Sequence, residues 1–308
     1  MRTFLNIKWL FLATLLGCLS VVHGLEWGNE LGSSSYKVMK VAPTARQTAL
    51  AGSGLANPGS ATESAWNPMA AAWANSPQIS INQVRLSDRL GANWNTLQVV
   101  QPLGSVRVSA GVNFLDVKDF AERDDLTGAT TGSFGAFVWS ERLALASGPG
   151  AFTWGLQGSF SHFNISNYDS RAVLADAVMG YGLSKSWRLA AGLFHFGWVE
   201  SFDAKQDLAP TTLQAGISYH LNFPESLDWN VHTDLRRSND GLREYMLGIE
   251  STYRKFLTLR MGSQVTSQTE TTINGGIGLL LGSVEASYAY AAHKSLKGSH
   301  SFGLAYGF

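Results

Sequence analysis

His300-Ser301-Phe302-Gly303-Leu304-Ala305-Tyr306-Gly307-Phe308 closes the chain, and from Ser301 onward small residues alternate strictly with large apolar ones. This alternation indicates a β-strand, because successive side chains of a strand point to opposite faces. A large apolar face opposite a face of small residues is typical of a strand with lipid on one side and a confined interior on the other. A water-soluble sheet rarely carries such a bare apolar edge, which invites aggregation. We therefore expect a transmembrane β-barrel.

The final residue strengthens this prediction. A last strand that ends on an aromatic residue resembles the C-terminal signal of bacterial outer-membrane β-barrels. The resemblance implies that the barrel-assembly machinery inserts the chain and that outer-membrane lipid surrounds it. The residues that carry this barrel-assembly signal are Phe302, Leu304, Tyr306 and Phe308.

The N-terminus has the features of an export signal. Arg2 and Lys8 supply positive charge beside an apolar run, and small residues follow at the positions that signal peptidase reads. We expect a signal peptide at residues 1–24, cleaved after Gly24. An alternative stays open, because the run Leu-Leu-Gly-Cys ending at Cys18 resembles a lipobox and would leave a lipidated cysteine at the new N-terminus. Both alternatives predict an exported protein.

Composition narrows the class further. The chain has 308 residues with 32 Gly, 10 Trp, 9 Tyr and 16 Phe, but only 15% charged residues and no formal net charge. Beyond the leader, no run approaches the roughly 20 apolar residues of a transmembrane helix, which leaves a closed sheet as the membrane-spanning structure. The neutral charge balance gives no reason to expect a nucleic-acid partner. The single cysteine lies in the leader, so we expect neither a disulfide nor a thiolate metal site in the mature chain.

After residue 77 the sequence reads as strands and turns, which predicts an all-β antiparallel barrel over residues 78–308. Connections of alternating length support this reading, because outer-membrane barrels have short periplasmic turns and longer outer loops. The connection at 141–150 is longer than this rule expects, and the charged stretch 119–125 is expected in the longest outer loop. We count fourteen strands, at 79–86, 94–101, 105–115, 133–140, 151–163, 172–183, 187–200, 211–221, 227–236, 244–253, 256–265, 271–281, 284–291 and 299–308.

Residues 25–77 do not follow the strand pattern. They are rich in Ala, Gly, Ser and Asn and are too apolar for a plain tether, yet they lack a core of their own. Packing inside the barrel lumen as a hatch would satisfy both properties. A flexible periplasmic extension is the alternative.

Two short motifs in this segment resemble a known group. Residues 44–54 form an Ala/Gly-rich turn, and a polar stretch and an Asn-Pro box follow within residues 55–71. This arrangement is similar to the N-terminal signature of the PorV/PorQ-type branch of the FadL superfamily, although Met69 and Ala70 depart from the usual Ala-Gly. The resemblance implies a fourteen-stranded barrel with an N-terminal hatch. The hatch-signature residues are Arg46, Gly52, Gly54, Asn67 and Pro68.

Polar residues are expected on the inner face of several strands. Buried charges must pair, stay hydrated or bind the hatch, because an unpaired buried charge is costly. We favour a paired network that anchors the hatch over a hydrophilic permeation path. The predicted lumen polar network comprises Arg107, Asp228, His232, Asp234, Glu250, Arg260 and Glu285.

No motif for catalysis, phosphate binding or metal binding is found, so we expect neither an enzyme nor a cofactor. The PorV/PorQ resemblance implies an assembly factor that receives secreted cargo proteins in a type IX-like pathway. The alternative is a FadL-like transporter that moves hydrophobic small molecules, such as long-chain fatty acids, across the outer membrane. A third reading is a barrel kept for envelope integrity. The expected contacts to a hydrophobic ligand are Trp66, Met69, Trp73, Phe194, Phe196 and Trp198.

Overall fold

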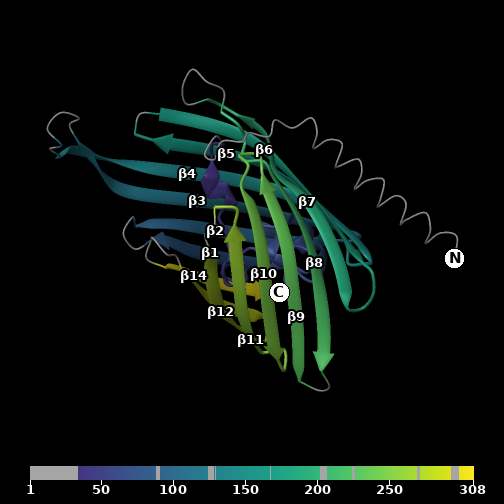
Figure 1. Cartoon of the computed structure of the whole chain (residues 1–308). Helices are drawn as coiled ribbons and strands as arrows, with labels where there is room; N and C mark the ends of the chain where they lie inside the picture. The colour runs from purple at the N-terminus through teal and green to yellow at the C-terminus, as the bar shows by residue number, and fades with distance from the viewer. Residues whose placement is uncertain are drawn as a thin grey trace.

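The protein forms one closed barrel of antiparallel strands around an N-terminal segment (Figure 1). The computed structural model describes residues 34–87, 91–123, 128, 130–166, 168–201, 207–223, 226–268, 271–292 and 298–308. Each strand pairs with its neighbours in sequence, and the first strand closes the ring on the last through pairs from Gln78 with Gly307 to Arg85 with His300. The predicted barrel of fourteen strands is confirmed. The predicted signal peptide, its cleavage site and Cys18 lie outside the described residues.

Most observed strand bounds fall within two or three residues of the predicted ones. The bounds are β1 Gln78–Ser87, β2 Ala92–Leu103, β3 Val106–Arg123, β4 Thr130–Ser147, β5 Phe152–Ile165, β6 Tyr168–Gly182, β7 Trp187–Val199, β8 Thr212–Phe223, β9 Leu227–Ser238, β10 Arg243–Tyr253, β11 Leu257–Thr266, β12 Thr271–Leu281, β13 Val284–Ala291 and β14 Ser299–Gly307.

In the β3–β4 hairpin, β4 is longer at both ends than the sequence pattern predicts and β3 is longer at its outer end (Figure 1). The prediction of a connection over 141–150 is wrong, because β4 continues to Ser147. Arg142 is buried toward the lumen while Leu143 on the other face is exposed, so the period-two pattern persists. At the outer end β3 continues through Arg123, and the charged stretch 119–125 is therefore partly strand rather than loop. A strand that projects beyond the membrane does not need an apolar face.

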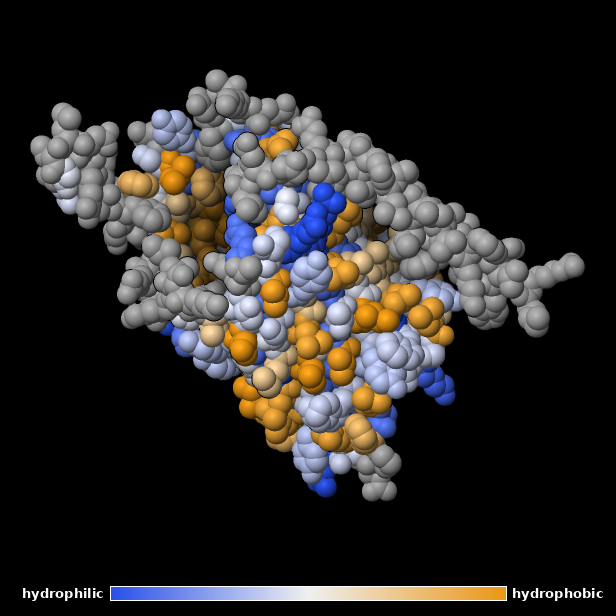
Figure 2. Space-filling view, in the orientation of Figure 1, coloured by the Kyte–Doolittle hydropathy of each residue, from blue (hydrophilic) through white to orange (hydrophobic). Residues whose placement is uncertain are grey.

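The outer surface of the barrel is apolar. Large hydrophobic side chains on alternate positions are exposed, as Leu235, Leu247 and Leu259 are on three successive strands. Figure 2 shows such apolar side chains gathered over the strands that face the viewer. Among the described residues no helix is long and apolar enough to cross a membrane. The side chains of the proposed assembly signal lie on this outer surface, with exposed fractions of 44% for Phe302, 55% for Leu304, 44% for Tyr306 and 71% for Phe308.

The N-terminal segment lies inside the barrel as four short helical turns, which together form the hatch (Figure 1). Each of the last three begins at a residue whose side chain accepts a backbone hydrogen bond, as helix N-caps do. Asn67 accepts from the amide of Met69 at 3.1 Å, and Pro68 follows in the first helical position, where a missing N–H costs nothing. The Asn-Pro box is thus a helix start. The four turns are η1 Lys37–Lys40, α2 Ala45–Ala49, η2 Ala61–Ala65 and η3 Pro68–Trp73.

The hatch packs directly on the barrel wall. Gly155 on the inner face of β5 shows how close the approach is, because a Cβ atom at this position would overlap the backbone of Pro68 and Met69. A glycine in the wall therefore lets the η3 backbone touch the sheet. The predicted hatch is present in the lumen, and its described part begins at Ser34.

Candidate functional site in the lumen

Glu250 on β10 is the centre of a buried ionic cluster that joins the hatch to the wall. Arg46 on α2 donates from Nε to Glu250 Oε2 at 3.0 Å and from Nη2 to Glu250 Oε1. On the wall side, Arg260 Nε donates to Glu250 Oε2 at 2.9 Å and His232 Nε2 lies 3.1 Å from Glu250 Oε1. Both carboxylate oxygens thus have one partner from the hatch and one from the barrel. Glu285 is a more distant member, 3.8 Å from Arg260 Nη2.

Electrostatics within the hatch depend on the same arginine. Burial opposes the charge of Arg46, but Glu250 more than offsets this effect, so the pKa of Arg46 is raised. Glu63 on η2 is also fully buried, and desolvation raises its pKa to about 7 although Arg46 and a hydrogen bond from Thr44 both favour its ionised form. Thr44 Oγ1 donates to Glu63 Oε2 at 2.7 Å. The hatch therefore holds a carboxyl group that titrates near neutral pH.

The other predicted network residues are not part of this cluster. Asp234 is fully buried and accepts the Leu55 amide at 3.0 Å and the Gln214 side-chain amide at 2.8 Å, so it anchors the middle of the hatch. Arg107 donates to the Ala74 carbonyl at 3.1 Å and fixes the end of the hatch. Asp228 is only partly buried and lies 3.8 Å from His220. The predicted network is therefore several separate anchors.

The two hatch-signature glycines occupy a turn that needs them. Gly52 and Gly54 have φ angles of +81° and +96°, which side chains with a Cβ rarely adopt. The turn brings the Leu55 amide to Asp234 and the Gly52 carbonyl to Gln214 at 3.2 Å. Turn and wall are thus joined by backbone groups of the hatch.

Four of the six expected ligand contacts come together. Trp66 stacks on Phe194 with ring centroids 6.2 Å apart and an interplanar angle of 19°. Met69 is fully buried in the same apolar cluster as Phe194, and Trp73 packs at its edge. Arg188 lies over the Trp73 ring at 5.1 Å, and Arg236, which pairs with Glu244, lies over Trp66 at 5.7 Å. This aromatic cluster lies between η3 and strands β6 and β7.

A β-bulge at His195 separates the other two expected contacts from this cluster. His195 has a φ of +54°, and the register between β6 and β7 shifts by one residue opposite it. Asp176 on β6 accepts the His195 amide at 2.5 Å and so satisfies the extra residue. Because an inserted residue reverses which side chains face inward, Phe196 and Trp198 point outward, with exposed fractions of 45% and 54%.

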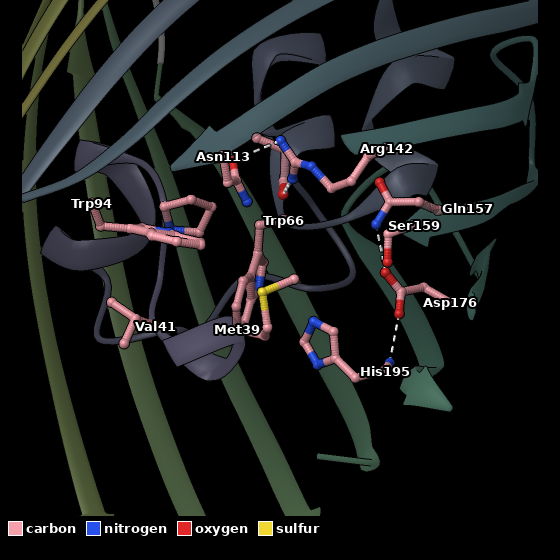
Figure 3. Close-up of a pocket in the computed structure, with 12 residues that line it drawn as sticks. Met39, Val41, Trp66, Trp94, Asn113, Arg142, Gln157, Ser159, Asp176 and His195 are labelled. Carbon is pink, nitrogen blue, oxygen red and sulfur yellow. Dashed lines mark hydrogen bonds between the residues drawn. The ribbon is translucent and has the colours of Figure 1, made fainter. Parts of the chain in front are cut away.

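Two narrow cavities meet at this bulge. The first lies among Met39, Trp66, Trp94, Arg142 and His195, and the second among Trp66, Phe194, His195, Thr212 and Arg236. Each has room for roughly one water molecule, so the site is closed to larger molecules in this conformation. Figure 3 shows the first cavity, with the His195 ring directed toward Met39 and Trp66.

The pairing between β7 and β8 ends beside the second cavity. The β7–β8 ladder runs from Trp187 with Tyr219 up to Phe194 with Thr212. Beyond the bulge, β7 stays paired with β6 as far as Val199, but the described residues of β8 do not continue beside it. Thr211 instead donates its hydroxyl to the His195 carbonyl at 3.3 Å. The chain before β8 turns inward, where Leu208 pairs with Ser34.

Apolar residues line the lumen beyond the cavities, away from the end that holds Gln78. Tyr36 and Met39 of the hatch fill this space against inward-facing residues such as Trp94 and Leu174. Burial raises the pKa of Tyr36 to about 12, and its hydroxyl donates to Ser170 at 3.1 Å. Lys40, 3.3 Å from Asp240, holds this part of the hatch to the loop after β9.

Sequence reasoning missed three residues of the first cavity. Arg142 falls in the stretch predicted as a connection, although Leu143 and Leu145 on alternate positions mark it as an inward-facing strand residue. Asp176 lies on the inner face of β6, where the pattern permits a polar residue but does not select it. His195 appears in the sequence only as one of several scattered histidines, since nothing there marks the bulge. In the part of the chain that the structure describes, no cluster of histidines and carboxylates is suited to a metal ion.

Comparison with solved structures supports the fold assignment. The barrel is similar to the CymD monoaromatic hydrocarbon channel, with a TM-score of 0.63 and 13% identity over 87% of this chain and 98% of that one. It is also similar to the Ralstonia pickettii toluene transporter TbuX, with a TM-score of 0.58 and 12% identity over 87% of this chain and 100% of that one. For the Pseudomonas putida toluene transporter TodX the TM-score is 0.54 and the identity 13%, over 91% and 98% of the two chains. No family model and no curated protein matches the sequence.

These observations define the class of protein. The chain is a bacterial outer-membrane β-barrel of fourteen strands with a hatch in its lumen, and it shares its fold with the three compared proteins. The compared proteins are transporters and channels. At these identities the likeness concerns the fold alone.

Proposed function

We propose that this protein is an outer-membrane channel for small hydrophobic molecules, which pass between the hatch and the barrel wall. The observation that carries the proposal is the pair of cavities that share Trp66 and His195 and lead to the end of the β7–β8 ladder. Ligand sites for hydrophobic molecules combine apolar and aromatic surface with polar groups that fix orientation. Here Met39, Trp66 and Phe194 supply apolar surface, and polar side chains make up at least half of each lining. The fold likeness to channels for toluene and other monoaromatic hydrocarbons supports the same class of substrate.

The path is closed at rest, and the hatch supplies the moving parts. Met39 is flexible and polarisable, and Trp66 is held by ring contacts to Phe194 and Arg236. Displacing these two side chains would join the cavities without breaking the buried Glu250 cluster. A molecule that passes Phe194 then reaches β7 at the point where the ladder to β8 ends, and Phe196 lies on the lipid side of that point. The proposed exit is therefore lateral, into the membrane.

The PorV/PorQ resemblance and the secretion role that it implies rest on the sequence pattern. The structural comparisons favour the transporter alternative over that role. The two functions predict different outcomes in one strain, because a shuttle would bind secreted proteins with a shared C-terminal domain and would leave hydrocarbon uptake unchanged.

Uptake by whole cells tests the proposal. A Gram-negative host with an intact lipopolysaccharide barrier and no hydrocarbon channel of its own is given the wild-type protein, a T212F variant or an empty vector. Initial uptake of radiolabelled toluene is then measured over the first seconds. The proposal predicts faster uptake with the wild-type protein than with the vector, and uptake at the vector level with T212F, which fills the second cavity.

The matched control is A215F, which adds the same ring on the outer face of the same strand. This variant should take up toluene at the wild-type rate. Heat-modifiable migration in gels checks that each variant forms a barrel. Equal uptake by wild type and vector would refute the channel. Co-purification of secreted proteins with a common C-terminal domain, from the same cells, would then favour the shuttle.

A further inference from the structure

The first cavity contains buried hydrogen-bond donors for which the described part of the chain supplies no acceptor. Arg142 Nε, the indole Nε1 of Trp94 and the ring Nδ1 of His195 all lack a partner among the described residues. The three side chains line the same cavity and are at least nine-tenths buried. Arginine and tryptophan nitrogens can only donate, so at least two of the three need an acceptor. Leaving such groups unpaired is costly, which makes the cavity a place for an oxygen atom.

Arg142 is also a buried cation surrounded by neutral acceptors. Its partners in the described part of the chain are the Ala65 carbonyl, the Asn113 side-chain oxygen at 2.9 Å and the Gln98 side-chain oxygen at 3.2 Å. Figure 3 shows the guanidinium extending from β4 toward Asn113. These contacts fix two of the guanidinium nitrogens and leave Nε to the cavity.

Asp176 limits the charge of a ligand. Its carboxylate lines the same cavity and accepts from the His195 amide at 2.5 Å and from Gln157 at 2.5 Å. One positive and one negative side chain therefore balance within the cavity. A neutral ligand keeps this balance, whereas a carboxylate ligand would place a second negative charge beside Asp176 in a poorly hydrated space.

The apolar side chains of the lining determine which molecular skeleton the cavity binds. Met39, Val41, Trp66 and Trp94 supply apolar and aromatic surface, on which a flat ring packs well. The closed cavity holds only about one water molecule, so a ring enters it only when Met39 and Trp66 are displaced as the proposed path requires, and a small molecule needs the smallest displacement.

We infer that the first cavity is a selectivity site for small neutral aromatic molecules that carry one hydrogen-bond-accepting oxygen, with Arg142 Nε and Trp94 Nε1 as the donors. This inference rests on the proposed channel function and names its preferred substrate class. The oxygen replaces water on the two donors and reproduces its hydrogen bonds, whereas a plain hydrocarbon leaves them unpaired.

Three probes of nearly equal size separate the alternatives. The ketone 4-fluoroacetophenone presents a neutral acceptor. The ethyl compound, 1-ethyl-4-fluorobenzene, presents no acceptor, and 4-fluorobenzoate presents an anion. Binding to the full-length protein in nanodiscs is measured by fluorine NMR, with empty nanodiscs subtracted to remove partition into lipid. We expect the ketone to bind about tenfold more tightly than the ethyl compound, as one hydrogen bond to a charged donor implies. We expect benzoate to bind most weakly.

Two variants and a control test the assignment to residues. R142M should bring the ketone and the ethyl compound to equal affinity. D176N removes the negative charge but can still accept from the His195 amide, so it should strengthen benzoate binding while leaving the ketone unchanged. D176N therefore decides the matter if R142M fails to form a barrel. R243M, which alters an exposed arginine at the start of β10 outside the cavity, should keep the wild-type preference.

The outcomes distinguish this inference from the channel proposal. Equal binding of the ketone and the ethyl compound to the wild-type protein would overturn the inference and leave the channel intact, since water would then satisfy the donors. Tightest binding of benzoate would overturn it as well. Failure of all three probes to bind would refute the channel and the inference together.

Discussion

Loss of Arg46 should loosen the hatch by an amount that the structure allows us to estimate. The R46M variant removes two charge-assisted hydrogen bonds to Glu250 and a third bond, of 3.0 Å, to the Asn57 carbonyl. Removing one partner of a buried ion pair typically costs about 3–5 kcal/mol, much of it from the charge left unpaired. Glu250 keeps Arg260 on one oxygen and His232 on the other. We therefore expect a cost near the lower limit, about 3 kcal/mol.

Loss of Glu250 should be worse. E250Q removes the negative charge between Arg46 and Arg260 and one of the two acceptor oxygens, and so leaves two buried guanidinium groups close together with Glu285 as a distant partner of one. We expect a cost near the upper limit, about 5 kcal/mol. The double variant R46M/E250Q should cost less than the sum of the two single variants, because it removes opposite charges from one cluster.

Hydrogen exchange of hatch amides measures these costs. Exchange at α2 reports the free energy of opening the hatch when closing is faster than exchange. A cost of about 3 kcal/mol corresponds to exchange faster by a factor of roughly 150. Amides of the β-strands away from the cluster serve as the internal control, since R46M leaves their ladders intact. Unchanged hatch exchange in R46M, or a smaller effect for E250Q than for R46M, would refute the reasoning.

Three further predictions concern the titration of the hatch, the packing of the hatch on the wall and the lipid-facing surface. The pKa of Glu63 is raised from 4.5 to about 7, so between these pH values the docked hatch binds more protons than the released hatch. Docking should therefore weaken by about 3 kcal/mol as pH rises from 4.5 through 7. E63Q should abolish this dependence when exchange of the hatch amides is followed against pH. G155A should loosen the hatch by about 1–3 kcal/mol because its Cβ would overlap Met69, whereas G158A, with open space around its Cβ, should not change hatch exchange. L143R places a charge on the lipid face, where Leu143 is 60% exposed, and should lower the free energy of barrel unfolding, measured in urea, by about 2–4 kcal/mol. The control E141R should cost less, because Glu141 is already charged on the same face. Equal losses for the two variants would contradict the assigned lipid-facing surface.

Much of the barrel follows from sequence alone, because period-two alternation directly reports which face of a strand meets lipid. The strand at Thr271–Leu281 and the strand at Val284–Ala291 are predicted without error. The hairpin around Arg142 is not, since a charged residue on the inner face of a strand looks like the polar residue of a turn. Only Leu143 and Leu145, which are exposed on either side of buried Ala144, distinguish a strand from a turn here.

The site is harder to predict because it depends on pairings between distant residues. Arg46 and Glu250 are 204 positions apart, and nothing in either neighbourhood specifies the other as a partner. The bulge at His195 is equally hidden, although it reverses the direction of Phe196 and Trp198. The hatch-signature residues are different. Asn67, Pro68 and the two turn glycines are local signals, and each acts through its own backbone geometry.

Photolabelling tests the central claim, passage between hatch and wall, most directly. A small aryl diazirine of toluene size is activated on the full-length protein in nanodiscs, and labelled peptides are identified by mass spectrometry. The account predicts labels at Trp66, Phe194 and His195 that excess toluene suppresses, together with labels on lipid-facing strands that toluene does not suppress. Labels confined to the lipid-facing surface, with none at the hatch, would contradict it.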